Sequence, residues 1–267
     1  MTERIGMGIR RFGRVNWRGL GTLVGREIRR FVAVYIQTLL APLATAVLFM
    51  TVFTLAFGAD RGAVMGMPFE VFLAPGVLMM AVIQNAFANT SSSLMIAKEQ
   101  GNIVDTLMAP LSPGEILAGY VAGGMARGAL CAVAVGVVVF PAVGTGLAHP
   151  LWAFAFVGMG CLMLSLIGLL AAIYAAKFDQ MAAITNFIIT PLSFLSGTFY
   201  SIERLPPLFQ TLSHANPFFY LIDGFRYGAL GVSDSSPWLG LAVVATLNAA
   251  LWGLAWRWLT SGYRLKS

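Results

Sequence analysis

Apolar runs of about 20 residues or more, almost free of charge, recur along this chain of 267 residues. One such run spans a bilayer as a helix, and a soluble fold of this size cannot hide so much apolar surface. Only 10% of the residues are charged, against roughly 25% in a typical soluble domain. We therefore predict an all-α integral membrane protein with six spans, near Phe31–Phe57, Phe69–Leu94, Leu117–Val143, Leu151–Ala176, Met181–Tyr200 and Trp238–Leu259.

Basic residues are distributed unevenly around these runs. Eight of the 17 Lys and Arg lie in the first 30 positions, and 14 of the 17 share one side if both termini lie in the cytoplasm. Loops that stay in the cytoplasm carry an excess of basic residues. We therefore expect both termini in the cytoplasm. The net charge of +6 indicates a membrane flank rather than a nucleic-acid surface, because it is concentrated beside the first apolar run.

Residues 1–30 are rich in arginine, and their second half has the spacing of an amphipathic helix. The charged sector of that helix consists of Arg18, Arg26, Arg29 and Arg30. Such a helix lies in the membrane interface, with arginines at the lipid phosphates and its apolar side in the acyl boundary. The alternative is that these arginines only set the topology.

The segment 95–116 is the longest predicted cytoplasmic loop. Ile96, Ile103 and Leu107 recur at helical spacing, which predicts a short amphipathic helix that Pro110 ends. Ser112, Pro113 and Glu115 then form a helix-start signal with a capping box. This loop is either a solvated turn or a docking element whose displacement would tilt two spans together.

The segment 201–237 is the longest predicted external segment. Prolines divide it into pieces too short to span a membrane, yet its many aromatic residues make it apolar. Paired short helices that dip into the outer leaflet satisfy both features. Asp223 and Arg226 are three residues apart and can pair on one face. We assign Tyr220, Asp223 and Arg226 to a candidate external gate; the alternative is an ion pair that only holds the loop.

Polar residues within the spans are candidates for a substrate route: Gln84, Asn85, Asn89 and Asn186. Hydrogen bonding between helices is the alternative role. Gly119 with Gly123, and Gly124 with Gly128, form G-x-x-x-G pairs. These pairs allow helices to approach closely, either within one chain or between two copies.

The sequence contains no arrangement that predicts catalysis. It has no G-x-x-x-x-G-K-[ST] loop and no H-E-x-x-H, and its two histidines, His149 and His214, are far apart. The spans are also nearly free of the carboxylates that a membrane enzyme places at depth. We expect a non-catalytic protein without a cofactor or metal of its own.

Two segments carry a family resemblance. Residues 97–112, AKEQGNIVDTLMAPLS, resemble the first cytoplasmic loop of ABC-2-type transporter permeases, where an acidic-glycine stretch precedes L-x-x-[ATS]-P-[LV]-S. FLSGTFY at 194–200, with Leu205-Pro206-Pro207, Asn216-Pro217 and YLIDGFR at 220–226, resembles the stretch before the family's last span. Ser201 stands where many members have proline, and Gln100 replaces a common charged residue. The resemblance covers essentially the whole chain as one transmembrane domain, 1–267.

The resemblance implies the membrane subunit of an exporter in the bacterial cytoplasmic (inner) membrane. Such a subunit works with a second copy, in a homodimer, and with two cytoplasmic ATPase subunits that bind ATP and Mg²⁺. The segment 95–116 would be the coupling helix and its flanks, with ATPase contacts at Glu99, Gly101, Asn102, Asp105, Leu107, Pro110, Leu111 and Ser112. Apolar walls with few charges favour an amphipathic, lipid or lipid-linked substrate. The alternative function is a self-contained channel or ion-gradient-driven secondary transporter.

Overall fold

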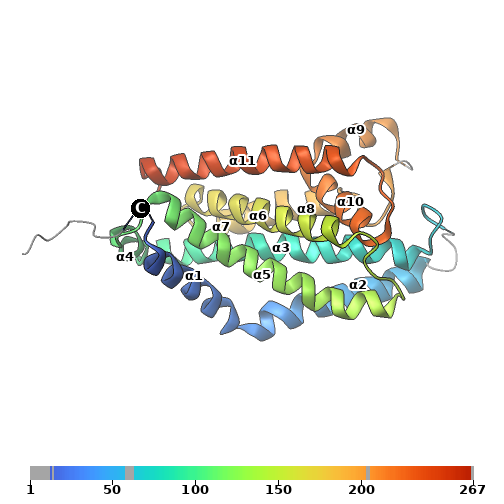
Figure 1. The fold of residues 1–267 in the computed structure, drawn as a ribbon, viewed down its shortest axis with the longest axis horizontal. Coiled ribbons are helices and arrows are strands. Elements are labelled where there is room, and N and C mark those ends of the chain that lie inside the picture. The colour runs from blue at the N-terminus through green and yellow to red at the C-terminus, as the bar shows by residue number, and fades with distance from the viewer. Residues whose placement is uncertain (1–12, 14, 58–62, 203–204, 266–267) are drawn as a thin grey trace, which may run out of the picture.

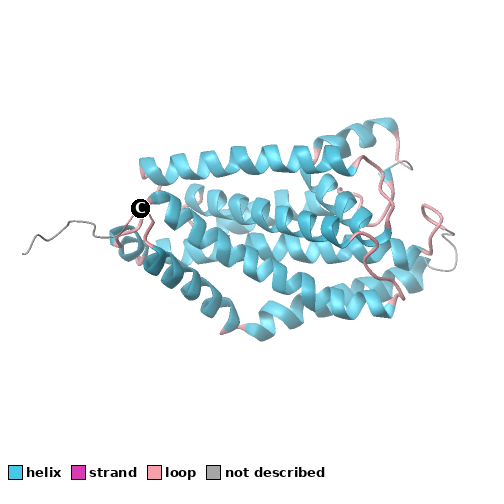
Figure 2. Ribbon diagram, viewed as in Figure 1, coloured by secondary structure: helices cyan, strands magenta, loops and turns pink. Residues whose placement is uncertain are grey.

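The fold is an elongated bundle of helices, known from a computed structural model that describes residues 13, 15–57, 63–202 and 205–265. Over these residues the regular structure is helical, apart from one isolated β-bridge between Val64 and Met67. Figure 2 shows the loops gathered at the two ends of the bundle. The predicted all-α membrane fold is confirmed.

Helices follow one another along the chain with short connections. They are α1 (Trp17–Val32), η1 (Ile36–Leu40), α2 (Ala41–Phe57), α3 (Phe69–Glu99), α4 (Ile103–Met108), α5 (Pro113–Ala142), α6 (Pro150–Tyr174), α7 (Phe178–Ile184), η2 (Thr185–Ile189), α8 (Thr190–Phe194), α9 (Pro207–Ala215), α10 (Pro217–Leu230) and α11 (Pro237–Ser261). The η segments are π-helical turns.

The two ends of the bundle differ in content. Helices α1 and α4 and the end of α11 lie at one end, and α9 and α10 lie at the other (Figure 1). Helix α3 forms the centre and packs against α5, α6, α2 and α10, whereas α2 and α11 are mostly exposed. Both described ends of the chain therefore lie at the same end of the bundle. Which side of the membrane that end faces stays a prediction.

Five helices in the described part of the chain are long and apolar enough to cross a membrane: Ile36–Ala56, Phe69–Glu99, Pro113–Ala142, Pro150–Tyr174 and Pro237–Ser261. In place of the fifth predicted span, 181–200, three consecutive short helices run from Phe178 to Phe194. They end earlier than predicted because residues 195–200 form turns and bends. The first span also differs from the prediction, since Phe31 belongs to α1 and a turn separates it from the membrane helix.

Helix boundaries follow local chemistry. Helices α6, α9, α10 and α11 each carry proline at a first-turn position, where the missing N–H costs no hydrogen bond. Helix α5 begins with the predicted capping box: Ser112 N donates to Glu115 Oε2 over 2.5 Å, and Glu115 N donates to Ser112 Oγ over 3.4 Å. Gly231 and Gly262 end α10 and α11 in the left-handed conformation that favours glycine.

The prediction of one short helix that includes both Ile96 and Leu107 is wrong about where this helix starts. Ile96 belongs to α3, which continues to Glu99, and the separate helix α4 begins only at Ile103. Gly101 divides the two helices, because its φ of 75° lies in the left-handed region and cannot continue α3.

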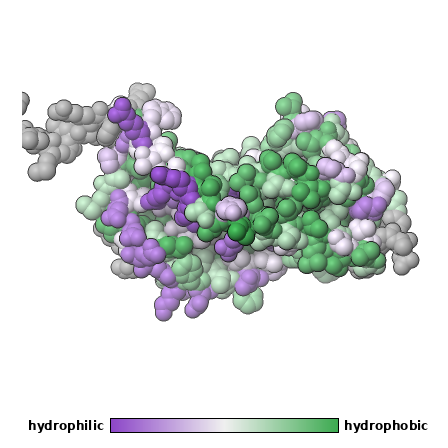
Figure 3. Space-filling model, turned by 90° about the horizontal axis from the view of Figure 1, so that it is seen from below, coloured by the Kyte–Doolittle hydropathy of each residue, from purple (hydrophilic) through white to green (hydrophobic). Residues whose placement is uncertain are grey.

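Hydropathy follows the long axis of the bundle. Figure 3 shows hydrophilic side chains gathered at the end that holds α1 and the end of α11, while most of the remaining described surface on this face is apolar. This distribution is the one that a bilayer requires of the surface between two aqueous ends.

Candidate functional site

Helix α1 is fastened to the predicted coupling loop by Asn16. Asn16 Oδ1 accepts from Gly19 N over 3.0 Å and so caps α1, while Asn16 Nδ2 donates to Pro110 O over 3.2 Å. The backbone N–H of Asn16 donates to Glu115 Oε1 over 2.6 Å. One buried asparagine therefore joins α1 to the α4–α5 connection and to the first turn of α5.

Arg26 makes the second contact between α1 and this loop. Its Nη1 donates to Thr106 Oγ1 over 3.1 Å, and its Nη2 donates to Tyr120 Oη over 3.2 Å. Nη2 also lies 3.3 Å from the Glu27 carboxylate. The pKa of Arg26 is raised: burial acts to lower it, but Tyr120 and Glu27 outweigh that effect. Arg26 thus links α4 and α5 through one guanidinium.

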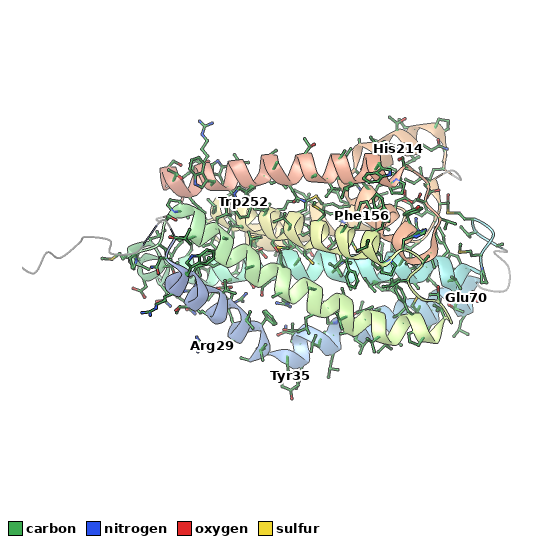
Figure 4. All side chains as sticks on the ribbon, in the orientation of Figure 1. Arg29, Tyr35, Glu70, Phe156, His214 and Trp252 are labelled. Carbon is green, nitrogen blue, oxygen red and sulfur yellow. The ribbon has the colours of Figure 1, made fainter. Side chains whose placement is uncertain are left out.

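Arg30 is directed at the central helix α3. Its Nη2 donates to Asn89 O over 2.7 Å and to Asn89 Oδ1 over 3.0 Å, and its Nη1 donates to Ser92 Oγ over 3.2 Å. Its Nε lies 3.5 Å from Glu27 Oε2. The other two arginines of the predicted charged sector, Arg18 and Arg29, are exposed, and Arg29 points away from the bundle (Figure 4).

Glycines on α5 create the groove that α1 occupies. A Cβ on Gly119 would lie 2.3 Å from Leu23 Cδ2, and one on Gly123 would lie 2.5 Å from Glu27 Cβ. On another side of α5, Gly124 and Gly128 contact α6 at Ser165 and Cys161 in the same close manner. Both G-x-x-x-G pairs therefore serve packing within the chain.

The predicted coupling residues divide into an exposed and a packed set. Gly101, Asn102, Asp105 and Pro110 are exposed at the end of the bundle, whereas Leu107, Leu111 and Ser112 are half-buried. Ile103 and Thr106 point inward, so α4 turns one side to the bundle and the other to the surroundings. The exposed side also carries Met108, which is 80% exposed.

The end of α3 is joined to the connection between α6 and α7. Lys98 Nζ donates to the carbonyls of Ala172, Ile173 and Ala175 over 3.0, 3.0 and 2.6 Å. It thereby satisfies the free carbonyls at the end of α6. Glu99 Oε1 accepts from Phe178 N over 3.3 Å, at the start of α7. These bonds fasten the end of α3 to α6 and to the start of α7.

A cavity of about 570 Å³ lies on the side of the bundle. Its walls come from η1 and α2 on one side, from α7, η2 and α8 on the other, and from α3 and α5. Most of the lining is apolar, but several polar side chains face it: Gln37, Gln84, Asn85, Ser91, Ser92 and Arg127. Both π-helical segments contribute to the lining, and such turns are frequent at functional sites.

The four candidate route residues occupy different environments. Gln84 and Asn85 line the cavity. Asn89 is fully buried and binds Arg30, and Asn186 is exposed outside the lining. Arg127 also lines the cavity and was not predicted to do so, although an arginine inside an apolar span is itself a signal of function.

Arg226 forms a fully buried polar centre at the opposite end of the bundle. Its Nη2 donates to Gly197 O over 2.6 Å, and its Nη1 lies 3.6 Å from Asp223 Oδ1 and 3.7 Å from Asp234 Oδ2. Asp223 accepts from Asp234 N and Ser235 N over 2.8 and 2.9 Å. The predicted pair is therefore present, and it holds two loops against α10.

The third candidate gate residue is separate from this centre. Tyr220 packs against Phe219, with ring centroids 5.1 Å apart, and its Cβ lies near Gly240 of α11. Asp234, the second carboxylate beside Arg226, was not predicted, because no local pattern marks a loop aspartate as the partner of a residue on α10.

The helical fold of the described residues and their apolar spans define a membrane protein, which has a cavity with both polar and apolar lining on its side. Residues 18–230 match the profile of the ABC-2 type transporter family. The chain is 36% identical to the inner membrane transport permease YadH of Escherichia coli K12, over 94% of this chain and 98% of that one. It is 24% identical to nodulation protein J of Neorhizobium galegae, over 73% and 74% of the two chains.

This chain belongs to the ABC-2 type transporter family. Accordingly, it is a multi-pass permease of the inner membrane, in agreement with the resemblance found in its sequence.

Proposed function

We propose that this permease is the membrane-spanning half of an ATP-driven exporter. It pairs with a second copy and with two cytoplasmic ATPase subunits that bind ATP and Mg²⁺. The substrate is an amphipathic lipid or lipid-linked molecule, which moves along a route between the two copies. Export of lipid-like molecules requires a mostly apolar surface with a few polar groups, and the side cavity has that character.

The observation that carries this proposal is the attachment of α4 to the spans. Its outer side is exposed, while Thr106 is bonded to Arg26 and Pro110 to Asn16. An ATPase that pushed on the exposed side would therefore displace α1 and the first turn of α5 together. Lys98 and Glu99 extend the same attachment to α6 and α7.

We propose that the second copy of the permease contacts this chain on the side of the bundle where the cavity opens. Helices α2 and η2 border the cavity and carry exposed apolar residues, among them Leu55 at 81% and Phe187 at 82%. Two copies that met through this side would enclose their cavities in one route.

Purification of the tagged chain from its native membrane, with an ATPase assay, tests the proposal. An ATPase subunit should copurify in a ratio of about one to one, the stoichiometry proposed above. Asp105→Lys should reduce its retention and ATP turnover, because it reverses the charge of a side chain that is exposed on α4. Thr211→Lys, which places the same lysine side chain on exposed α9 at the other end, is the control.

Isolation of a chain that transports without any ATPase, even after gentle crosslinking, would refute the proposal. That result would favour the gradient-driven alternative. Equal ATPase retention in Asp105→Lys and Thr211→Lys would refute the assignment of α4 as the docking element.

A further inference from the structure

Arg127 has an unusual position for an arginine. It lies within α5, one of the apolar spans, and lines the side cavity. Its Nε and Nη2 both donate to Asn85 Oδ1, over 3.3 and 3.2 Å. Throughout the described ranges, Nη1 has no hydrogen-bond acceptor, and no Asp or Glu lies within ion-pair distance of the guanidinium. A charge at membrane depth without a counter-ion is costly unless a ligand or water accompanies it.

The other cations of this region have partners. Arg30 and Arg26 share Glu27, and Arg30 is also bonded to Asn89 and Ser92. Arg30 lies within electrostatic range of Arg127 and adds to its positive potential. The cavity therefore contains an arginine whose charge the neighbouring side chains do not balance.

The depth of Arg127 fits the headgroup level of a leaflet. Arg30, at the end of the predicted interfacial helix, binds Asn89. Arg127 binds Asn85, one turn nearer the start of α3 and so farther from the end of the bundle that holds α4. One helical turn corresponds to about 5–6 Å, so an α1 that lies in the interface, as predicted, places Arg127 just beyond it, where phosphates meet acyl chains.

We propose that Arg127 binds the phosphate of an amphipathic phosphate ester in the side cavity. The planar guanidinium presents paired donors that match two phosphate oxygens. Asn85 orients it through Nε and one N–H of Nη2, so that Nη1 and the second N–H of Nη2 stay available as such a pair. The apolar lining, which includes Phe49, Val77 and Met80, receives the chain next to the headgroup. This assignment rests on the proposed transport function and names the chemical class of its substrate.

Equilibrium binding to the purified full chain, in neutral detergent and without an ATPase, tests this site. The probes are dioctanoyl phosphatidic acid, dioctanoylglycerol with the same chains and no phosphate, and inorganic phosphate. We expect phosphatidic acid to bind more tightly than either of the others. Equal affinity of dioctanoylglycerol would overturn the phosphate contact, and equal affinity of inorganic phosphate would overturn the amphipathic ligand.

Two variants assign the effect to Arg127. Arg127→Gln should lower the affinity for phosphatidic acid about tenfold or more, as expected for a charge-assisted hydrogen bond. Asn85→Asp should do the same while keeping the arginine, because the new carboxylate accepts the same N–H groups and neutralises the charge. This second variant decides the question if Arg127→Gln does not fold.

Arg257→Gln is the matched control, since it removes one arginine from the exposed surface of α11 and should leave binding unchanged. Unchanged affinity in both Arg127→Gln and Asn85→Asp would overturn the site. Because this binding measurement uses no ATPase, phosphatidic acid can bind even if the ATPase assay refutes the exporter proposal. Conversely, unchanged binding in both variants of a chain that does copurify with an ATPase would refute only the phosphate site.

Discussion

The guanidinium of Arg226 stacks on the ring of Phe72, with its central carbon 4.1 Å from the ring centroid. This contact joins α10 to the start of α3, at the end of the bundle opposite to α4. The carboxylates of Asp223 and Asp234 both lie within ion-pair distance of the guanidinium, and Gly197 O accepts a hydrogen bond from Nη2. The arrangement fixes the loops at this end and accounts for a buried arginine in an apolar segment.

Replacement of this arginine should strongly destabilise the protein. Arg226→Met leaves the carboxylates of Asp223 and Asp234 without their cation, which we expect to cost about 3–5 kcal/mol. The measurement is the thermal unfolding midpoint in detergent. Arg226→Lys keeps the positive charge without the paired donors, so its unfolding midpoint should lie between those of the wild type and Arg226→Met. An unchanged midpoint in Arg226→Met would contradict the role of this centre.

A larger residue at Gly123 should displace α1 from α5. Even the Cβ of a substituted residue would lie 2.5 Å from Glu27 Cβ, so Gly123→Leu cannot fit without movement of α1. In membrane fragments that a protease can reach from both faces, we therefore expect faster cleavage at the arginines of α1. Gly25→Ala is the control, because nothing lies within 4 Å of its added Cβ and alanine favours a helix. Equal proteolysis of the two variants would show that this close contact is absent.

The two functions of Asn16 can be separated by substitution. Asn16→Ala removes the helix cap and the bond to Pro110, and should cost about 0.5–2 kcal/mol from the cap. Asn16→Asp keeps an acceptor for Gly19 N but loses the donor to Pro110 O. Hydrogen exchange of the first turn of α1 should rise in the first variant and change little in the second. ATP turnover should fall in both, if α1 transmits the motion of α4.

Cysteine labelling tests the orientation of the chain. Cysteine at Asn102 should react from the cytoplasmic side and cysteine at Thr211 from the outside, because both positions are exposed at opposite ends of the bundle. The native Cys131 and Cys161 are each 1% exposed, so their background reaction should be small. Reversed labelling would overturn the prediction that both termini lie in the cytoplasm.

Much of the local structure was predictable because it depends on neighbours in the sequence. The capping box of Ser112 and Glu115 is such a case, and so is the spacing of Asp223 and Arg226. Where prediction failed, local geometry was the reason: Gly101 separates Ile96 from α4, and turns after Phe194 shorten the fifth predicted span.

The sites themselves were less predictable. Asn16 meets Glu115 across a separation of 99 residues, and Arg127 meets Asn85 across 42. No periodicity in the sequence specifies such contacts, because they depend on the packing of α1 and α5 against other helices. The division between Asn85 in the cavity and Asn89 bound to Arg30 has the same origin, although both lie on α3.

The sequence by itself determined the membrane class, the approximate positions of the helices and the family resemblance. These properties follow from apolar length, local capping and motifs, each of which acts over a few consecutive residues. Only the tertiary structure decided which polar side chains meet, which glycines receive α1, and where a cavity is left. A buried polar group must find its partner in space, and that partner is supplied by whichever helix packs beside it.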